Sequence, residues 1–371
     1  MTRSSIFSSE TYGGLAWRAP RGAAAALLLL LGAEVAVRGS RAAGVAAVRE
    51  ATGVQYATSD RGWVRADGIA WLNPVRATLH LVNPFRGVDV TLRTNNLGFA
   101  DADFDPRRAP GTLRVAVLGD SETASIQVPP ALNWTSALER MLPGRVGQPV
   151  EVMNFGVDAT GTGEHLFLLD RFVLAFDPDL VVLNFTPGDV GEAGVYPHPS
   201  ARYRGTVVGY RTPADLARAQ RRIDGFYSPV RIFALRASMA VRAINALLGR
   251  QNALNQLWHS ELAAPEPAAA IQRTLDDLER MEDRLAERGI PLVVVFYLPA
   301  ESDPRFEAFR RAFRPGPGVT LLDATAWCAD KNRDPTLRFR NDHHLNPRGS
   351  EAYASWLAPR LSPLLKERGG R

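Results

Sequence analysis

The chain has 371 residues, of which 46% are hydrophobic and 22% are charged, an ordinary balance for a globular protein with a sizeable core. Its formal net charge is +5, but no basic cluster is interleaved with aromatic residues, so the sequence does not favour a nucleic-acid partner. The single cysteine excludes an internal disulfide. The length allows one large domain with an appendage, or two domains.

The amino-terminal region contains an apolar run, Gly22–Val37, with five consecutive leucines and arginines on both sides. At about sixteen residues the run is short for a membrane span, which needs roughly twenty. We expect residues 1–21 to be a cytoplasmic leader and residues 22–38 to be an uncleaved signal anchor. The rest of the chain would then be periplasmic or extracellular, with the membrane as a partner. The alternative is a secreted protein whose signal peptide is cleaved.

Residues 45–112 have a strand-like, turn-rich pattern that predicts a small β-rich lead-in, and the main domain is expected over residues 113–366. The first apolar run of that domain, Val115–Leu118, shows no alternation of polar and apolar residues. This is typical of a strand buried on both faces of a parallel sheet. The strand is expected to end at the turn formed by residues 119–121.

Apolar runs and helical patterns then alternate along the rest of the chain, which predicts about five parallel strands with helices on both faces. The segment 191–212, with His198, is expected to be a surface loop that could serve as a lid or substrate rim. The further predicted strands are 150–154, 180–183, 291–298 and 319–322. The predicted helices are 133–142, 164–176, 215–248, 268–288, 304–313 and a last one after Gly349.

Two polar stretches far apart in the sequence have residue types that suit nucleophilic chemistry. Ser121 follows a buried strand, at the position where open α/β sheets place their ligands. Asp342 lies two residues before His344, so its carboxylate can bond one ring nitrogen and leave the other for a serine hydroxyl. Serine needs such help because its hydroxyl is a weak nucleophile. Each stretch taken alone also fits an ordinary polar loop.

Together the two stretches resemble the SGNH (GDSL-type) hydrolase family over roughly residues 92–365. Gly-Asp-Ser at 119–121 matches the first block of the family, and Asp-x-His at 342–344, followed by Leu-Asn-Pro-x-Gly, resembles the last. The resemblance implies Ser121 as nucleophile, His344 as general base and Asp342 as the carboxylate that orients the histidine.

Details at both ends of this resemblance bear on the assignment. Many members place two residues between the Asp and the His, whereas here there is one, and Asn341 occupies the other position. The Leu-Asn-Pro-x-Gly tail fixes the register on His344, although His343 could exchange roles with it. Arg93–Phe99 is similar to an element that precedes the nucleophile strand in membrane-anchored members.

The second and third blocks of the family are incomplete in this sequence. Ala159 stands where the second block usually has glycine, and its N–H is expected to join that of Ser121 in an oxyanion hole. Gly188 stands where the third block has the asparagine that normally donates to the oxyanion; Asn184 or Asn154 is an alternative donor. Losing one such donor typically costs about 3 kcal/mol. The resemblance gives supporting roles to Asp120, Asn154 and Asp189.

The resemblance implies an α/β fold, namely a flavodoxin-like three-layer sandwich, and hydrolysis of carboxylic esters (acyl or acetyl) through an acyl-enzyme. This chemistry needs no metal or organic cofactor, and no zinc-ligand set is evident in the sequence. The expected partners are ester-bearing small molecules, lipids or polysaccharides. Two alternatives stay open: an O-acyltransferase acting on envelope polysaccharide, and a catalytically impaired member that binds a glycan.

Overall fold

The computed structural model describes residues 18–43, 56–57, 63–64, 72–73, 75–83, 88–158, 160–192, 200–203, 206–209, 267–299, 303–339 and 342–369, with a few positions between 214 and 241. Ala159, His198 and Asn341 lie outside the described residues, as does most of the predicted helical segment 215–248. The chain forms two compact units. One consists of Met1–Val54 with Gly225–Ala253, and the other of Gln55–Asp224 with Leu254–Arg371.

The smaller unit contains helix α2 (Arg18–Ala42). The carboxylate of Glu34 accepts hydrogen bonds from Arg38 Nε at 2.6 Å, from Ser238 Oγ at 2.6 Å and from the Ala240 N–H at 2.9 Å. Among the described residues, no helix is long and apolar enough to cross a membrane. The predicted signal anchor over residues 22–38 therefore gains no support. Its apolar run of about sixteen residues, interrupted by a partnered charge, is shorter than the roughly twenty that a span requires.

The larger unit is built on a five-stranded parallel sheet with the strand order β11-β10-β7-β5-β6. Its strands are β5 (Leu113–Gly119), β6 (Val150–Asn154), β7 (Leu180–Phe185), β10 (Leu292–Phe296) and β11 (Val319–Asp323). Strands β5, β7 and β10 are buried along their whole length, which explains their continuous apolar sequences. All five strands coincide with predicted ones.

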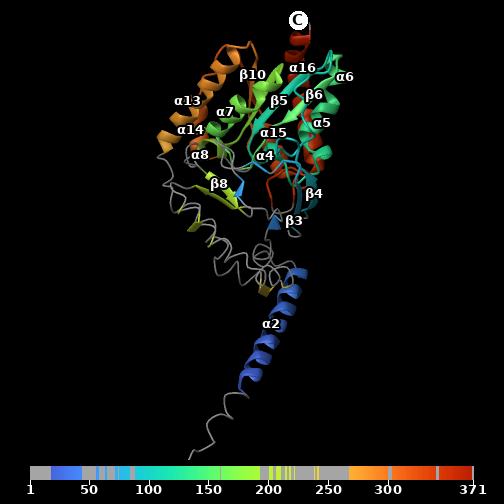
Figure 1. The fold of residues 1–371 in the computed structure, drawn as a ribbon, viewed down its shortest axis with the longest axis vertical. Coiled ribbons are helices and arrows are strands. Elements are labelled where there is room, and N and C mark those ends of the chain that lie inside the picture. The colour runs from blue at the N-terminus through green and yellow to red at the C-terminus, as the bar shows by residue number, and fades with distance from the viewer. Residues whose placement is uncertain are drawn as a thin grey trace, which may run out of the picture. The chain divides into compact units, whose positions relative to one another are not determined.

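Helices cover both faces of this sheet and give the predicted three layers (Figure 1). One face is covered by α7 (Thr162–Arg171), α13 (Pro267–Ala286) and α14 (Pro304–Ala312). The opposite face is covered by α5 (Trp134–Met141), α15 (Thr325–Arg333) and α16 (Pro347–Gly369). Shorter helices are α4 (Ser121–Ala124), η1 (Pro130–Leu132), α6 (Pro143–Val146), η2 (Val173–Phe176) and α8 (Pro187–Glu192). The α/β fold class is confirmed.

Short antiparallel strands make up two small sheets beside the main one. The lead-in provides β1 (Tyr56–Ala57), β3 (Thr78–Asn83) and β4 (Val88–Arg93) of the first sheet. The second sheet consists of β2 (Trp63–Val64), β8 (Ser200–Tyr203) and β9 (Thr206–Gly209). The prediction of a loop over 191–212 is therefore wrong at residues 200–203 and 206–209, where β8 pairs with β9. Its β-branched Thr-Val-Val run favours a strand.

Candidate active site

Ser121 lies on the tight turn that joins β5 to α4, at the point where the strand order of the sheet reverses between β5 and β7. Open α/β sheets bind ligands in the crevice at such a point. Gly119 adopts φ +154°, and a Cβ on it would lie 2.3 Å from Thr123 Oγ1 and 3.0 Å from the Asn184 oxygen. Glycine is therefore required there for α4 to approach the end of β7 closely enough to place the serine.

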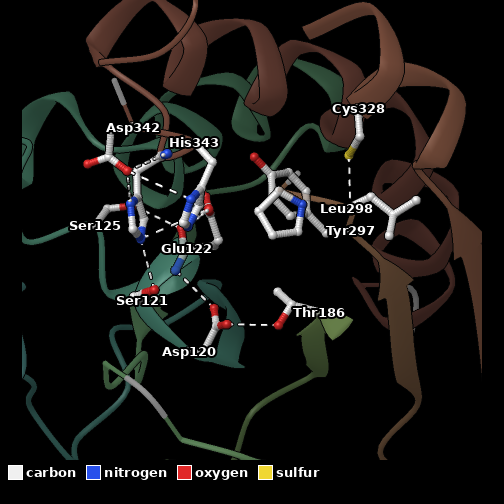
Figure 2. Close-up of polar contacts among 12 residues, drawn as sticks. Asp120, Ser121, Glu122, Ser125, Thr186, Tyr297, Leu298, Cys328, Asp342 and His343 are labelled. Atoms are coloured by element: carbon white, nitrogen blue, oxygen red, sulfur yellow. Dashed lines mark hydrogen bonds and ion pairs between the residues drawn. The ribbon is translucent and has the colours of Figure 1, made fainter. Parts of the chain in front are cut away.

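Asp120 fixes the start of α4 and ties it to the end of β7. Its Oδ1 accepts a hydrogen bond from the Glu122 N–H at 2.9 Å, and its Oδ2 accepts one from Thr186 Oγ1 at 2.8 Å (Figure 2). The Thr186 N–H in turn donates to Asp189 Oδ2 at 2.7 Å. Asp120 and Asp189 thus brace the two strand ends that flank the site. Burial raises the pKa of the Asp120 carboxyl.

The loop that precedes α16 brings an imidazole to Ser121. His344 Nε2 lies 2.9 Å from Ser121 Oγ, and His344 Nδ1 lies 2.7 Å from Asp342 Oδ1. The same Asp342 oxygen also accepts a longer hydrogen bond, 3.3 Å, from the His344 N–H. The structure therefore brings together serine, histidine and aspartate in one hydrogen-bonded series, although Ser121 and His344 are more than two hundred residues apart in the sequence.

Negative charge surrounds the imidazole. Burial by itself would lower the pKa of His344, but the charge of Glu122, together with the hydrogen bond and charge of Asp342, raises that pKa to about 9. Glu122 is itself buried, and this burial raises the pKa of its carboxyl to about 7. Its main-chain oxygen accepts a hydrogen bond from Trp134 Nε1 at 2.9 Å.

Of the residues proposed as side-chain donors to an oxyanion, Gly188 and Asn154 do not supply one. Gly188 lies in α8 and has no side chain to donate. Asn154 donates through Nδ2 to the Thr123 oxygen at 2.9 Å and to Thr135 Oγ1 at 3.3 Å, so its amide braces α4 and α5. Asn184 accepts through Oδ1 from the Tyr353 hydroxyl at 2.7 Å, while its buried Nδ2 has no hydrogen-bond partner among the described residues, so Asn184 stays a candidate donor.

Main-chain N–H groups are the other source of donors for an oxyanion hole. Ser121 is the first residue of α4, and the first N–H groups of a helix have no acceptor within it. The second expected donor, Ala159, lies outside the described residues. Of the two expected main-chain donors, the described part of the chain therefore contains the N–H of Ser121.

Sequence reasoning missed Thr186 and Glu122 near the triad, and it considered His343 only as a residue that could exchange roles with His344. Thr186 anchors Asp120, while Glu122 and His343 lie beside His344, with Glu122 Oε1 3.5 Å from His343 Nε2. In the described part of the chain, Glu122, His343 and His344 are the residues whose ligand atoms lie close enough together to hold a metal ion, all within 4.8 Å. A polar residue after a turn carries no signal of such a partner, so only coordinates could reveal this group.

No family model matches the chain, and no curated protein matches it. Solved structures of SGNH/GDSL-family esterases and lipases are similar in fold at low identity. The lipase Lip_vut3 from a goat rumen metagenome is 14% identical, with a TM-score of 0.38, covering 67% of this chain and 97% of its own. A putative lipolytic protein of the G-D-S-L family from Desulfitobacterium hafniense DCB-2 is 12% identical, with a TM-score of 0.40 and coverages of 66% and 98%. The SGNH-hydrolase family esterase AlinE4 is 15% identical, with a TM-score of 0.33 and coverages of 70% and 99%.

Proposed function

We propose that the protein is a serine esterase of SGNH type that hydrolyses carboxylic esters, acyl or acetyl, through an acyl-enzyme. The observation that carries the proposal is the pair of hydrogen bonds on one imidazole, 2.9 Å to Ser121 Oγ and 2.7 Å to Asp342 Oδ1. Such an arrangement activates a serine hydroxyl on many unrelated folds. It is the function that best uses all three side chains.

In this mechanism Ser121 Oγ attacks the ester carbonyl while its proton passes to His344 Nε2. The tetrahedral intermediate collapses, the alcohol leaves with the proton from Nε2, and the acyl group stays on the serine. Water then attacks the acyl-enzyme, giving its proton to Nε2, and the acid is released as Ser121 recovers its proton. Asp342 holds the proton on Nδ1 and stabilises the imidazolium that forms in each step.

The oxyanion would be held by main-chain N–H groups, those of Ser121 and of Ala159, without the asparagine side chain that Gly188 replaces. Removing one donor typically lowers the rate roughly 10² to 10³-fold. We therefore expect a slow esterase, or one specialised for esters with good leaving groups. The same incomplete oxyanion hole favours a second candidate function, a member that binds a glycan without turnover.

Substrate and location follow from the sequence and stay predictions. Ester-bearing small molecules, lipids and acylated polysaccharides are the substrate classes, and transfer of the acyl group to a polysaccharide hydroxyl is the variant reaction in which the acceptor replaces water. We place the protein outside the cytoplasm because of the apolar run that follows the arginines of its amino-terminal segment. Protease accessibility in intact cells and in spheroplasts checks this location.

The proposal is tested with p-nitrophenyl acetate and a fluorophosphonate probe on the purified protein. We expect turnover by the unaltered protein and a loss of roughly 10⁴-fold or more in Ser121→Ala. The probe should label Ser121, and His344→Gln should abolish labelling, since an unassisted serine reacts poorly. Equal rates in the unaltered protein and Ser121→Ala, with no labelling, would contradict the proposal and favour the glycan-binding candidate.

A further inference from the structure

Glu122 is a buried carboxylate that the triad does not use. The residue is 3% exposed, and neither carboxylate oxygen has a hydrogen-bond partner among the described residues. The nearby ammonium of Lys331 donates instead to the Pro299 oxygen at 2.9 Å. Burying an ionised carboxylate without a hydrogen-bond donor is costly, so a proton on Glu122 or a cation close to it would stabilise this group.

Two histidines face this carboxylate. Glu122 Oε1 lies 3.5 Å from His343 Nε2 and 4.0 Å from His344 Nε2. The two imidazole rings stack with their centroids 4.3 Å apart at an interplanar angle of 28°, and the Nε2 atoms of both lie near the same Glu122 oxygen. Figure 2 shows Glu122 and His343 pointing toward each other beside Ser121. One oxygen and two nitrogens therefore converge on a single point.

The donor set and its spacing fit a transition-metal ion. A zinc ion bound tetrahedrally with bonds of about 2.0 to 2.2 Å has its ligand atoms ~3.4 Å apart. Here the Glu122 oxygen lies 3.5 and 4.0 Å from the two nitrogens, and all three atoms lie within 4.8 Å of one another. His344 Nδ1 bonds Asp342 at 2.7 Å, which is the carboxylate–histidine support that metal-binding imidazoles usually have. The side chain of His343 is 45% exposed, so an ion can enter from solvent on that side.

We propose that Glu122, His343 and His344 form a binding site for a divalent transition-metal ion, with Zn²⁺ as the best match, and that an ion bound there switches the triad off. The inhibitory part rests on the proposed function. His344 Nε2 faces Ser121 Oγ at 2.9 Å, and its one lone pair cannot both coordinate a metal and accept the serine proton. The carboxylates of Glu122 and Asp342 both lie beside the two imidazoles, and a metal ion bound there replaces the proton of His344 Nε2 in balancing their charge.

Metal binding is measured first, without reference to activity. The full chain is stripped with EDTA, exchanged into chelator-free buffer and titrated with CoCl₂, followed by its visible absorption, and the Co²⁺ is then displaced with ZnCl₂. We expect one equivalent to bind with an intense band typical of a four-coordinate site. Glu122→Gln and His343→Gln should each weaken binding at least ~10-fold, since each removes a ligand. Glu279→Gln, which removes an exposed carboxylate on α13, should bind like the unaltered protein.

The second arm measures hydrolysis of p-nitrophenyl acetate against ZnCl₂ concentration. Half-inhibition should coincide with half-saturation of the metal site and should shift by the same factor in His343→Gln. If the protein hydrolyses no ester, the proposed function fails, and the cobalt titration by itself decides whether the metal site exists. The site is overturned if no band forms, or if both ligand variants bind Zn²⁺ as tightly as Glu279→Gln does, because binding would then be to the surface. Far-ultraviolet circular dichroism confirms that each variant is folded.

Discussion

At the scale of single residues, the tautomer of His344 decides whether Ser121 has a base. The proton must lie on Nδ1, where the Asp342 carboxylate accepts it at 2.7 Å, so that Nε2 can accept from the serine. Asp342→Asn keeps the size of the side chain but can donate to Nδ1, which favours the wrong tautomer. We expect kcat for p-nitrophenyl acetate to fall roughly 10⁴-fold with little change in stability. Initial rates and a urea melt measure the two quantities.

Asp330→Asn is the matched control for this prediction, since it makes the same change on the exposed face of α15. It should keep the full rate. If Asp342→Asn also retained more than about a tenth of the rate, the role of Asp342 as the orienting carboxylate would be wrong.

Gly156 is a second residue on which the position of Ser121 depends. A Cβ at Gly156 would lie 2.3 Å from the Ala124 nitrogen and 2.6 Å from the Thr123 carbonyl carbon, both of them main-chain atoms that cannot move aside without shifting α4. We expect Gly156→Ala to cost about 1 to 3 kcal/mol, as overpacking usually does, and to lower kcat by displacing Ser121. Urea unfolding and ester turnover are the measurements.

The control is Gly144→Ala, because a Cβ at Gly144 meets nothing within 4 Å. It should leave both stability and turnover within error or slightly raise stability, since alanine is the better helix former. Equal stability in the two variants would show that the loop at Gly156 relaxes freely and does not fix α4.

At the scale of elements, the two ends of β5 have different roles: the amino end contributes to stability, and the carboxyl end positions Ser121. At its amino end Arg114 is 2% exposed. Its guanidinium donates to Glu151 Oε2 at 2.7 Å and to the main-chain oxygens of Phe176 at 2.9 Å and Asp105 at 2.6 Å. Arg114→Met removes these donors and leaves their acceptors unpaired, which should cost about 3 to 5 kcal/mol. Turnover per folded molecule should not change, because Ser121 follows the opposite end of the strand.

Arg140→Met is the control that tests whether the loss of any arginine would lower the stability as much as Arg114→Met does. Arg140 pairs with Glu351 at 3.0 Å, and both side chains are about half exposed, at 52% and 54%. Such a surface pair contributes about 0 to 1 kcal/mol, so the urea midpoint should barely move. A comparable loss of stability in both variants would contradict the importance assigned to the buried position.

The same strand shows why the elements were predictable to different degrees. A parallel strand buried on both faces has an unbroken apolar sequence, so β5, β7 and β10 were evident from the sequence alone. The hairpin β8–β9 lies in a polar, tyrosine-bearing part of the sequence, and α15 has little apolar periodicity, so neither was predicted. One-turn α4 depends on the Asp120 cap and on the fit at Gly119, which are properties of the packed structure.

At the scale of the whole molecule, the site combines predictable and unpredictable parts for one physical reason. The resemblance of two sequence blocks to the SGNH family pointed to Ser121, His344 and Asp342 as a group, because their chemistry requires one another. Nothing in the chemistry of an esterase requires Glu122 or His343, so their approach to 3.5 Å follows only from how the two distant loops meet. The prediction of Asn154 as a donor to the oxyanion failed for a related reason. Asn154 has the right residue type, but its amide donates to the main chain of α4.

His165 in α7 makes the stability of the whole molecule depend on pH. Its side chain is fully buried, with Nε2 3.1 Å from Thr160 Oγ1, and burial, only partly offset by the Gly119 main chain, lowers its pKa from 6.5 to about 3. In the unfolded chain His165 is protonated below about pH 6.5, whereas in the folded protein it stays neutral down to about pH 3. Stability from the neutral histidine is therefore complete above pH 6.5 and is lost progressively as the pH falls toward 3.

His165→Gln isolates this contribution, because glutamine can still bond Thr160 but does not titrate. Between pH 7.5 and pH 5 the unaltered protein should lose about 2 kcal/mol more of its free energy of unfolding than the variant does. Buried carboxyls such as Glu164, whose pKa is raised to about 7 by burial, act in the opposite direction but are common to both proteins and cancel in the difference. Urea unfolding at the two pH values gives the difference directly. Parallel losses in the two proteins would mean that His165 is protonated in the folded state, with Asp189, whose Oδ1 lies 4.0 Å from its Nδ1, as the partner.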